Sequence, residues 1–548
     1  MRAVLSEKVI RIYDAYLYRE AIKQIPGRHY DAEDKAWVVP LTEENVAKLQ
    51  IYGASMEEEL TEILQANSPI KKDEEPISKM RLKVKAYCHQ IAAFNYTLRQ
   101  YEKGKGVAML ADMGTGKTLI TISVAGALQE KGIIKRMLVV APKSIVPVWR
   151  MEFQKFADFR YAFAELDGDI TKKRAALGYM TDAKVLQVVA VSYESCWRLE
   201  KEITKWKPDF IVCDESLKIK NPMAKQAKAL HNLGKLSKKN MILTGTFITC
   251  GPLDAFSQYK FVDENIFGAS FYNFRSKYAI IGGFKNKQVV GYKNMDDFVR
   301  KIHSIAFRIR LEDAVDMPPY IDETRYVTLE PSAKAMYDQL EKDSYMELEQ
   351  GEITMRNVLT LHLRLAQFTG GFLRSDDGGL QQVSSAKLEA LEDIVDSCIA
   401  ANRKVAVFAR FVPEIEAISK MLKDKGIDHS VIMGSVQDRA EQVRRFQEEP
   451  EVKVFIGQLQ TASKGLTLTA ASVEVFYSLD FSFENYDQSR RRIYRIGQKK
   501  KCLYIHLVCK GTDDEWIMDV IKHKGNVSKL VTDEWRALVQ KKQQKREE

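Results

Sequence analysis

The stretch "ADMGTGKT" at residues 111–118 decides how this chain is expected to fold. The apolar run "GVAMLA" (106–111) leads into it, and the helical "LITISVAGAL" (119–128) follows. A buried strand, a glycine-rich loop and a helix in this order form a loop that can bind phosphate. A chance "GKT" in a glycine-rich turn is the alternative, and the flanking strand and helix argue against it. The sequence therefore predicts a phosphate-binding loop.

The residues of this loop indicate a nucleotide bound with a metal ion. Gly114 and Gly116 let backbone N–H groups approach phosphate oxygens, because no Cβ stands in the way. Lys117 supplies a point charge to the β and γ phosphates, and the Thr118 hydroxyl can bind magnesium. Ala111 stands where the full pattern has its first glycine. We expect ATP and Mg²⁺ as cofactors.

Apolar runs recur along the chain in two series. The first is "GVAMLA", "RMLVVAP", "VLQVVAVSY", "DFIVCDE" and "MILTGT" (106–246), and the second is "KVAVFARF", "HSVIMG", "VKVFIGQL", "VEVFYSLD" and "CLYIHLVC" (404–509). Continuous Val, Ile and Leu runs are typical of strands buried on both faces of a parallel sheet. Two series therefore predict two α/β lobes. Residues 250–400 are expected to be mostly helical, with amphipathic segments at 332–350 and 357–368.

The first 70 residues differ from both series and predict a small α+β domain. "VIRIYDAY" (9–16) indicates a strand, "YREAIKQIP" (18–26) a helix, and "GRHYDAEDKAWVVP" (27–40) a hairpin that turns through Asp31–Asp34. The polar stretch "NSPIKKDEEPISK" (67–79) has two prolines and is the expected linker.

Composition limits the class of protein. Of the 548 residues, 45% are hydrophobic and 29% are charged, which is typical of a globular protein with a large core. The net charge of +10 favours a polyanionic partner. The seven cysteines form no CxxC pair, so we expect free thiols in a reducing compartment and no structural zinc. Charges interrupt the N-terminal segment, and no apolar stretch reaches 18 residues, so neither a signal peptide nor a membrane contact is expected.

Two carboxylates end the strand "DFIVCDES" (209–216) about 100 residues after the loop. Asp214 is expected at the magnesium, and Glu215 beside the attacking water as general base. A solvated loop is the alternative for an isolated Asp-Glu pair. In "LTGT" (243–246), Thr244 and Thr246 can link the nucleotide site to a neighbouring surface, although a plain turn would look the same.

The stretch "QSRRRIYRIGQKKK" (488–501) holds seven cationic residues in fourteen positions. Such a run is either a solvated or polyanion-binding patch, or a source of arginines for a nucleotide. On a helix, Gln488, Arg492 and Arg495 share one face. Spacing alone does not exclude Arg491 from the same role.

The order of these motifs resembles the Swi/Snf-type ATPases of helicase superfamily two over roughly residues 80–525. The further motifs are "AYCHQ" (86–90), "VVAPKSIVPVW" (139–149), "VSYE" (191–194), "CDESLKIKN" (213–221), "FRIRLEDAVDMPP" (307–319), "VFARF" (407–411), "GSVQDRAEQVRRFQ" (434–447) and "TASKGLTLTAA" (461–471). "SLKIKN" and "RIGQ" are the most specific. Leu217 departs from the family, which usually has a histidine there that couples hydrolysis to the next motif. Phe247 replaces a proline, and "DFSFENYDQ" replaces a Trp-Asn-Pro.

The resemblance implies two tandem RecA-like lobes with helical insertions, together with specific residue roles. The implied catalytic residues are Lys117, Asp214, Glu215, Arg492 and Arg495, with Thr118 and Asp214 at the magnesium. The implied nucleotide contacts are Gln90, Met113, Gly114, Thr115, Gly116, Lys117, Thr118, Gly465 and Gln488. The implied nucleic-acid contacts are Pro142, Lys143, Ser144, Ser192, Tyr193, Arg410, Gly434, Thr461, Ser463 and Lys464. Arg490, Arg491 and Lys499 to Lys501 are expected to be solvated or to face DNA.

"IPGRHYDAEDKAWVVPL" (25–41) resembles the HARP element that accompanies the motor of annealing helicases, where it engages branched or single-strand/double-strand junctions. A small α+β docking domain with a buried Trp37 is the alternative. The expected domains are a HARP-like module at 1–70, a linker at 71–80, a first lobe at 81–320, a helical segment at 321–385, a second lobe at 386–525 and a charged tail at 526–548.

The function implied is an ATP-dependent double-stranded DNA translocase that remodels or anneals forks and joint molecules in DNA repair or recombination. It would act as a monomeric motor, cytoplasmic in a bacterial or phage setting or nuclear in a eukaryote. Two alternatives stay open: a strand-separating DNA or RNA helicase, and an ATP-gated DNA-binding scaffold with little hydrolysis. Leu217 is the support for the scaffold, and the intact Lys117 and Glu215 speak against it.

Overall fold

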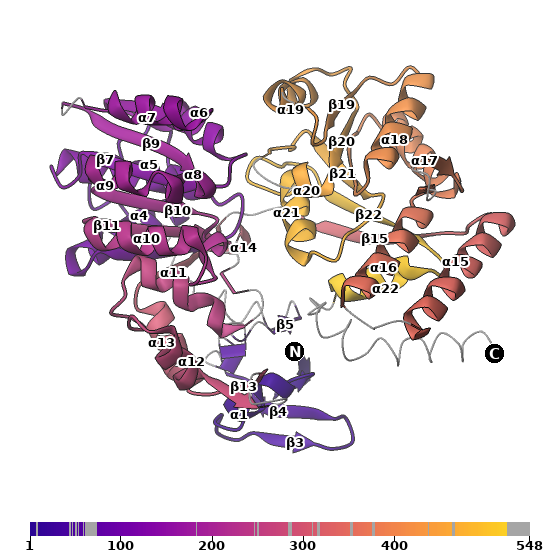
Figure 1. The fold of residues 1–548 in the computed structure, drawn as a ribbon, viewed down its shortest axis with the longest axis horizontal. Coiled ribbons are helices and arrows are strands. Elements are labelled where there is room, and N and C mark those ends of the chain that lie inside the picture. The colour runs from indigo at the N-terminus through magenta and orange to yellow at the C-terminus, as the bar shows by residue number, and fades with distance from the viewer. Residues whose placement is uncertain are drawn as a thin grey trace. The chain divides into compact units, whose positions relative to one another are not determined.

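The computed structural model describes residues 1–6, 9–42, 45–46, 48–49, 52, 54–57, 60, 74–181, 184–245, 247–248, 251–282, 288–309, 311–314, 318–350, 355–374, 379–436, 438–462 and 466–522. The chain divides into two compact units, Met1–Asp316 and Met317–Glu548, each with its own sheet (Figure 1). Several predictions lie outside the described residues, namely those on Thr246, Ser463, Lys464, Gly465, residues 67–73 of the linker and the tail at 526–548.

The first unit is built on a seven-stranded sheet in the order β14-β6-β11-β10-β7-β9-β8. All of its strand pairs are parallel. The strands are β6 (Gly106–Ala111), β7 (Arg136–Ala141), β8 (Tyr161–Glu165), β9 (Leu186–Ser192), β10 (Phe210–Asp214), β11 (Lys239–Thr244) and β14 (Ala306–Ile309). Alternate residues of β6 enter two different cores, Ala108 and Leu110 in one and Val107 and Met109 in the other. All six residues of "GVAMLA" are buried, because β6 is covered on both faces. A strand in that position needs an uninterrupted apolar run.

Helices cover this sheet and extend it. They are α4 (Cys88–Lys103), α5 (Lys117–Glu130), α6 (Val146–Phe156), α7 (Ile170–Gly178), α8 (Tyr193–Arg198), α9 (Glu200–Trp206), α10 (Lys225–Leu236), α11 (Ala255–Val262), α12 (Phe271–Tyr278), α13 (Met295–His303) and α14 (Leu311–Ala314), with the 3₁₀ turns η2 (Ser216–Ile219) and η3 (Pro252–Asp254). A hairpin of β12 (Ala279–Gly282) and β13 (Gln288–Tyr292) lies between α12 and α13. None of the described helices is long and apolar enough to cross a membrane.

The N-terminal residues form a five-stranded sheet in the order β3-β4-β2-β1-β5. Its elements are β1 (Arg2–Ser6), β2 (Val9–Tyr13), η1 (Tyr16–Tyr18), α1 (Arg19–Ile22), β3 (His29–Asp31), β4 (Ala36–Pro40) and β5 (Ser55–Met56). The expected hairpin is present, with Asp31 paired to Ala36 across the turn. Arg11 closes it by binding both Asp31 (2.8 Å) and Asp34 (2.5 Å).

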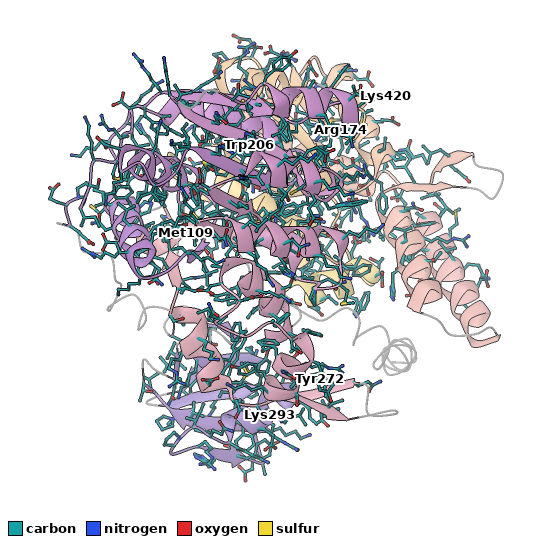
Figure 2. All side chains as sticks on the ribbon, turned by 60° about the vertical axis from the view of Figure 1, so that its left-hand side comes forward. Met109, Arg174, Trp206, Tyr272, Lys293 and Lys420 are labelled. Atoms are coloured by element: carbon teal, nitrogen blue, oxygen red, sulfur yellow. The ribbon has the colours of Figure 1, made fainter. Side chains whose placement is uncertain are left out.

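This N-terminal sheet packs against the β12–β13 hairpin. Tyr18 lies between the rings of Tyr52 and Tyr292, with centroid separations of 5.4 and 5.2 Å. Figure 2 places Lys293, which directly follows β13, beside the N-terminal sheet. Buried residues of the N-terminal sheet therefore belong to the same continuous hydrophobic core as one face of the large sheet.

The second unit has a six-stranded parallel sheet in the order β15-β22-β21-β18-β20-β19. Its strands are β15 (Tyr320–Val327), β18 (Lys404–Ala409), β19 (His429–Ile432), β20 (Val454–Gln458), β21 (Ala471–Phe476) and β22 (Cys502–Cys509), and β16 (Phe372–Arg374) pairs with β17 (Leu380–Gln382) in a separate hairpin. Its helices are α15 (Pro331–Gln350), α16 (Met355–Thr369), α17 (Ala386–Ala400), α18 (Val412–Asp424), α19 (Arg439–Glu448), α20 (Leu459–Ala462), α21 (Phe483–Ile493) and α22 (Asp513–Lys522).

The predicted fold class is confirmed: two lobes with parallel sheets and a small N-terminal sheet domain. The expectation that residues 250–400 are mostly helical is incomplete, because six strands (β12 to β17) lie there. One of them, β15, is an edge strand of the second sheet, although the sequence "YIDETRYV" has no long apolar run. Such a run is unnecessary at an edge, where part of the strand stays exposed.

Candidate functional site

The predicted phosphate-binding loop joins β6 to α5 at the carboxyl edge of the first sheet. Gly114 and Gly116 have left-handed backbone angles, with φ of +86° and +87°. A Cβ on Gly116 would come within 2.4 Å of the Gln90 amide nitrogen and push it from its place. Gly116 is also the N-cap of α5, and among the described residues no side chain caps this helix of 14 residues. Its first-turn N–H groups are arranged to receive an anion.

Two residues of α4 brace the loop. Gln90 Nε2 donates to the Thr115 carbonyl (3.2 Å), and His89 Nε2 lies 2.9 Å from the same oxygen. Gln90 Oε1 accepts from the Tyr87 N–H (3.1 Å), and His89 Nδ1 lies 3.1 Å from the Ala314 carbonyl. Burial lowers the pKa of His89, which favours a neutral ring. Gln90 was expected from the sequence, whereas His89 was not, and only its position next to Gln90 could have indicated it.

Lys117 and Asp214 form the charged centre of the site. The Lys117 ammonium donates to the Ala111 carbonyl (2.9 Å), and the Asp112 carbonyl lies 3.4 Å away. Asp214 ends β10 and is buried. Burial raises the pKa of Asp214, and the charge of Lys117 and a hydrogen bond from Trp149 Nε1 (3.0 Å) act in the opposite direction. The site therefore holds a carboxylate whose negative charge is only partly compensated.

Glu215 follows in an unusual conformation. Its φ of +53° and ψ of +58° place a residue with a side chain in the left-handed region, which costs on the order of 1–3 kcal/mol. The preceding peptide is held by the Tyr193 hydroxyl, which donates to the Asp214 carbonyl (2.8 Å). Strain of this kind is typical of functional positions.

The strand β14 and the start of α14 after it are tied to the phosphate loop. Arg308 Nη2 lies 3.4 Å from Asp112 Oδ1, and the Leu311 N–H donates to Asp112 Oδ2 (3.3 Å). Arg308 Nη1 donates to the Gly245 carbonyl (3.3 Å), just beyond Thr244 at the end of β11. Arg308 therefore links the loop to the "LTGT" segment.

In the second unit, Arg492 and Arg495 converge on one stretch of chain. Arg492 is buried, and its Nε donates to the Gln488 carbonyl (2.7 Å) and its Nη1 to the Leu466 carbonyl (3.0 Å). Arg495 donates to Thr467 Oγ1 (2.7 Å) and to the Leu466 carbonyl (3.3 Å). The expectation that Arg495 lies on the same helix is wrong, because α21 ends at Ile493. The two arginines are nevertheless close together.

The other cations of residues 488–501 were predicted to be solvated or to face DNA, and this holds for some of them and not for others. Arg490 is not solvated: its guanidinium lies 4.2 Å from the ring of Tyr504 and 5.1 Å from that of Tyr320, and it pairs with Asp322 (2.8 Å). Arg491 pairs with Asp487 (3.0 Å). Lys499, Lys500 and Lys501 are exposed, as expected.

Gln498 of "RIGQ" is a structural residue. Its Nε2 donates to the carbonyls of Thr469 (3.2 Å), Ala471 (2.7 Å) and Ile493 (3.1 Å). Its Oε1 accepts the N–H groups of Lys499 (3.0 Å) and Lys500 (2.9 Å). The amide thus fixes the turn that carries Arg495 against the start of β21.

A model of the SNF2-related domain matches residues 89–370, more than half of the chain. The chain belongs to the SNF2-related family. In this SNF2-related chain, residues 386–497 also match the helicase conserved C-terminal domain. The predicted resemblance to Swi/Snf-type ATPases is therefore confirmed at the level of the family.

Relatives of this SNF2-related chain come from bacteria, animals and archaea. It is 26% identical over 443 residues to the uncharacterized ATP-dependent helicase MG018 of Mycoplasma genitalium, covering 79% of this chain and 41% of the relative. It is 26% identical over 485 residues to the DNA repair and recombination protein RAD54-like of Danio rerio, covering 80% of this chain and 65% of the relative. The Sulfolobus solfataricus SWI2/SNF2 ATPase core in complex with dsDNA is 25% identical, with a TM-score of 0.41, covering 81% of this chain and 92% of that one. The chain spans about half the length of the curated relatives it matches.

The predicted nucleic-acid contacts of the first SNF2-related lobe differ in exposure. Lys143 and Ser144 are exposed in the loop after β7, whereas Pro142 is buried. Ser192 and Tyr193 are also buried. Ser192 caps α8 through the Ser195 N–H (3.2 Å). The expectation that Tyr193 contacts nucleic acid is corrected, because its ring is enclosed and its hydroxyl is bound to the peptide after Asp214.

In the second lobe, Gln458 brings two predicted contacts together. Its Oε1 accepts from the Gly434 N–H (3.2 Å) and from the Thr461 hydroxyl (3.1 Å). Arg410, another predicted contact, is half-buried, and its guanidinium packs over the ring of Phe411 at 5.0 Å. Gln458 was missed because an isolated glutamine at a strand end carries no motif signal.

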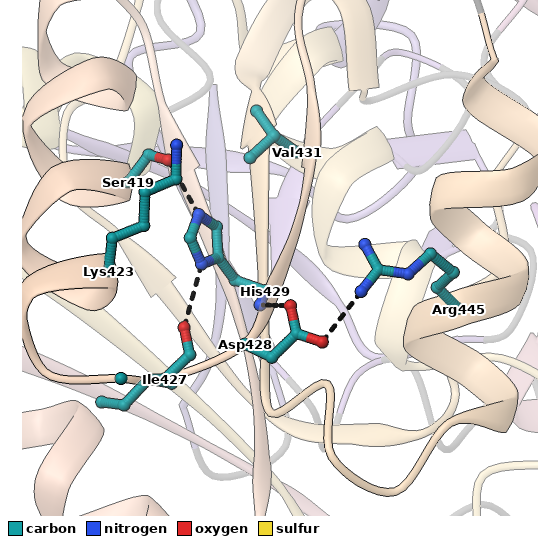
Figure 3. Close-up of a pocket in the computed structure, with 8 residues that line it drawn as sticks. Ser419, Lys423, Ile427, Asp428, His429, Val431 and Arg445 are labelled. Carbon is teal, nitrogen blue, oxygen red and sulfur yellow. Dashed lines mark hydrogen bonds and ion pairs between the residues drawn. The ribbon is translucent and has the colours of Figure 1, made fainter.

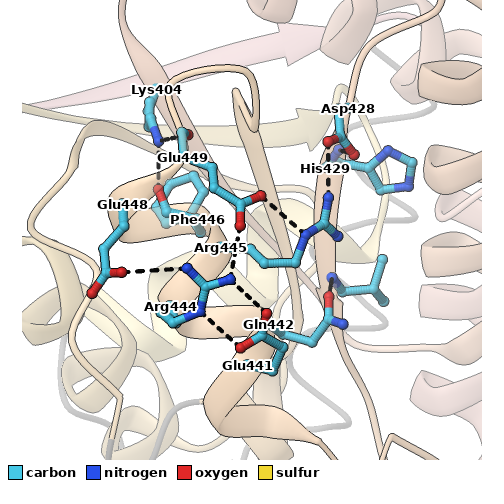
Figure 4. Close-up of polar contacts among 11 residues, drawn as sticks. Lys404, Asp428, His429, Glu441, Gln442, Arg444, Arg445, Phe446, Glu448 and Glu449 are labelled. Atoms are coloured by element: carbon cyan, nitrogen blue, oxygen red, sulfur yellow. Dashed lines mark hydrogen bonds and ion pairs between the residues drawn. The ribbon is translucent and has the colours of Figure 1, made fainter.

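A pocket of about 500 Å³ lies elsewhere on the second unit, between α18 and β19 (Figure 3). It contains none of the predicted site residues. His429 Nε2 lies 2.7 Å from the Ser419 hydroxyl, and His429 Nδ1 lies 3.1 Å from the Ile427 carbonyl. Asp428 pairs with Arg445 (2.8 Å), which joins the pocket to the ion pairs of α19 (Figure 4). These polar groups satisfy one another and hold α18, β19 and α19 together.

Proposed function

We propose that this chain is a DNA-dependent ATPase that moves along double-stranded DNA and remodels or anneals forks and joint molecules. The observation that carries the proposal is the pairing of a phosphate-binding loop with a buried, incompletely compensated carboxylate at one sheet edge. The name of the RAD54-like relative supports a role in DNA repair and recombination. Family membership supports both the ATPase activity and the DNA substrate.

The residues present fit ATP with magnesium. The uncapped first turn of α5 suits phosphate oxygens, and a cation beside Asp214 would favour its ionised form, which burial disfavours. Among the described residues, no group of three or more His, Cys, Asp or Glu side chains could hold a metal ion. Magnesium would therefore be held by Asp214 and Thr118 and take its remaining ligands from phosphate and water. When bound, it neutralises phosphate charge and polarises the bond that breaks.

Each side chain of the proposed site has its own role in ATP hydrolysis. Lys117 leaves the Ala111 carbonyl to hold the β and γ phosphates, and Glu215 takes a proton from the attacking water. Arg492 and Arg495 supply positive charge where negative charge develops. Gln90 and Gln488 orient the nucleotide, as do the loop residues 113–118 and Gly465.

We place DNA binding on exposed loops. Lys143 and Ser144 in the first lobe and Gly434 in the second are exposed, and the half-buried Thr461 on α20 shares Gln458 with Gly434. Ser463 and Lys464 lie outside the described residues and belong to the proposal through the resemblance alone. Contacts of this type reach backbone phosphates, which carry no sequence information. Sequence-independent tracking is the expected mode.

The N-terminal domain is proposed as a HARP-like junction-binding module. It docks on β13 through Tyr18, whereas its β3–β4 hairpin leaves His29 and Tyr30 exposed. Tyr30 lies edge-on against Trp37 at 5.3 Å. Trp37 itself is only half-buried, so the hairpin offers aromatic surface to bases at a junction.

The test is hydrolysis measured with duplex DNA, single strands, forks and RNA, together with displacement of a triplex-forming strand. We expect strong stimulation by duplex DNA, triplex displacement without duplex separation, and binding that weakens steeply with salt. RNA should stimulate poorly, because its A-form groove differs from that of B-form DNA. Strong stimulation by RNA, or separation of a blunt duplex, would support the helicase alternative. Binding of ATP and DNA without hydrolysis would support the scaffold.

A further inference from the structure

We propose that Gln258 is a positioning residue that acts through Ser216 to hold Glu215, and that it joins the carboxylate strand to the segment after β11. The inference rests on the proposed ATPase function and adds a residue to it. Gln258 lies on α11, outside every sequence motif described above.

The amide of Gln258 is enclosed, and both its oxygen and its nitrogen are hydrogen-bonded. Gln258 and Ser216 are both 0% exposed. The Ser216 hydroxyl donates to Gln258 Oε1 (2.6 Å). Gln258 Nε2 donates to the carbonyls of Phe247 (2.7 Å) and Asp254 (2.9 Å). Since both of these partners are carbonyls that can only accept, the NH₂ group must face them and the oxygen must face Ser216, so the amide has one orientation.

This bond lies next to a strained residue. Glu215 is in the left-handed region, a conformation that persists only when the surrounding structure fixes it. Tyr193 holds the peptide on one side of Glu215, through the Asp214 carbonyl, and Ser216 anchors the other side to Gln258. Leu217 has no polar side chain, and the hydroxyl of Ser216 provides a buried polar link between this turn and α11.

The amide nitrogen of Gln258 contacts the segment that follows β11, which Arg308 in turn ties to the phosphate loop. It holds the Phe247 carbonyl, two residues after Gly245, whose own carbonyl is held by Arg308. Arg308 in turn contacts the Asp112 carboxylate of the loop. Two sets of polar contacts therefore hold the segment after β11: Gln258 links Phe247 to the residue after Glu215, and Arg308 links Gly245 to the loop that would bind phosphate.

The test compares Ser216→Ala and Gln258→Met with two matched controls. Ser257→Ala removes a buried hydroxyl from the same helix, where it contacts His231 (3.1 Å), and Gln187→Met removes a buried amide that contacts Trp206 (3.3 Å). Gln258→Glu keeps an acceptor for Ser216 and replaces the donors that face Phe247 and Asp254. We measure kcat with saturating duplex DNA, affinity for a non-hydrolysable ATP analogue, thermal midpoint, and hydrogen exchange of residues 213–219 without nucleotide.

We expect Ser216→Ala and Gln258→Met each to lower kcat roughly 10-fold to 100-fold, as small misplacements of catalytic groups do, with analogue affinity unchanged. The double variant should be no worse than Gln258→Met, because that single variant already breaks the contact with Ser216. Hydrogen exchange at 213–219 should speed up in both variants and not in the controls. Gln258→Glu should keep slow exchange at 213–219, because it still accepts the hydrogen bond of Ser216. Its kcat should nevertheless fall, because the hydrogen bonds to the Phe247 and Asp254 carbonyls are lost.

Three outcomes would overturn the inference: unchanged kcat, additive losses, or equal losses in the controls. A loss of kcat that follows a loss of thermal midpoint and analogue affinity would also overturn it, because a purely structural role predicts that pattern. If wild type hydrolyses ATP and the variants match it, the inference alone fails. If wild type shows no hydrolysis with any DNA, the proposed function fails and the inference falls with it.

Discussion

The indole of Trp149 donates a hydrogen bond to the carboxylate of Asp214 across 3.0 Å, so a core residue of α6 stabilises the charge at the end of β10. This bond opposes the burial that raises the pKa of Asp214. Trp149→Phe removes the donor and should raise that pKa further. Protons then compete more strongly with magnesium, so the apparent magnesium affinity should fall more at pH 6 than at pH 8. Equal losses at both pH values would contradict this explanation.

Lys117→Ala should abolish nucleotide binding, whereas Glu215→Gln should bind nucleotide and stop at hydrolysis. In the proposed mechanism Lys117 holds charge on the phosphates, whereas Glu215 activates water and does not bind the nucleotide. Binding of a fluorescent ATP analogue separates the two variants. If both bind it as tightly as wild type, the role of Lys117 is wrong.

Arg492→Ala or Arg495→Ala should lower turnover by roughly 10³, as loss of other arginine fingers does, and leave ATP binding in place. Arg444→Ala is the matched control, because Arg444 lies on α19 and binds Glu441, Glu448 and Glu449 (Figure 4). Turnover at saturating duplex DNA is the measurement. Loss of DNA binding with normal DNA-independent hydrolysis would make these arginines part of a simple basic patch.

Deletion of residues 1–75 should reduce annealing and fork-specific activity, and it should also lower the thermal midpoint of the first unit. The second effect follows from the structure, because the deletion uncovers Tyr292 and the core that it shares with Tyr18. Tyr18→Ala should lower the midpoint less and leave the β3–β4 hairpin in place. Hydrolysis by the folded fraction should be retained in both. Equal annealing rates for full-length and truncated protein at matched ATPase activity would exclude the junction role.

Glu414 gives the second unit a pH dependence. Its Oε2 accepts the N–H of Phe411 (3.0 Å) and the hydroxyl of Ser478 (2.5 Å), and burial raises its pKa to about 7. Because the folded state binds this proton more tightly than the unfolded state, the stabilisation is complete below pH 4.5 and is lost as pH rises to about 7.

Glu414→Gln removes this titration and should be more stable relative to wild type at pH 8 than at pH 5, by up to about 3 kcal/mol. Denaturation midpoints of both proteins at the two pH values measure the difference. A difference that does not change with pH would show that Glu414 stays ionised in the folded protein.

The central strands of the two large sheets could be predicted from the sequence. Of the four edge strands described in these sheets, the sequence predicted β19, through the run "HSVIMG", and missed the other three. Strands such as β6 and β22 are buried on both faces, so their apolar runs begin and end at the same residues as the strands. The three missed strands of the large sheets, β8, β14 and β15, each pair with a single neighbour. An edge strand needs no continuous apolar run. The sequence "YIDETRYV" has no such run, so it does not indicate that β15 is a strand.

Some residues of the candidate site could likewise be predicted from the sequence, and others could not. Residues of the phosphate loop and the carboxylate pair were predictable, because a short continuous stretch carries their chemistry. Gln258, Gln458 and the tyrosine contacts of Arg490 depend on contacts between residues far apart in the chain. A single glutamine or tyrosine has no pattern of its own, so only the folded chain identifies its partner.

The contact between Tyr18 and Tyr292 has a consequence for protein engineering. A chimaera that carries this N-terminal sheet on another motor would keep Tyr52 beside Tyr18 but lose Tyr292, unless the β12–β13 hairpin came with it. Substitutions on either side should likewise be tolerated only when the other side changes to match. The portable unit is therefore the sheet together with its hairpin, two segments that lie more than 200 residues apart in the sequence.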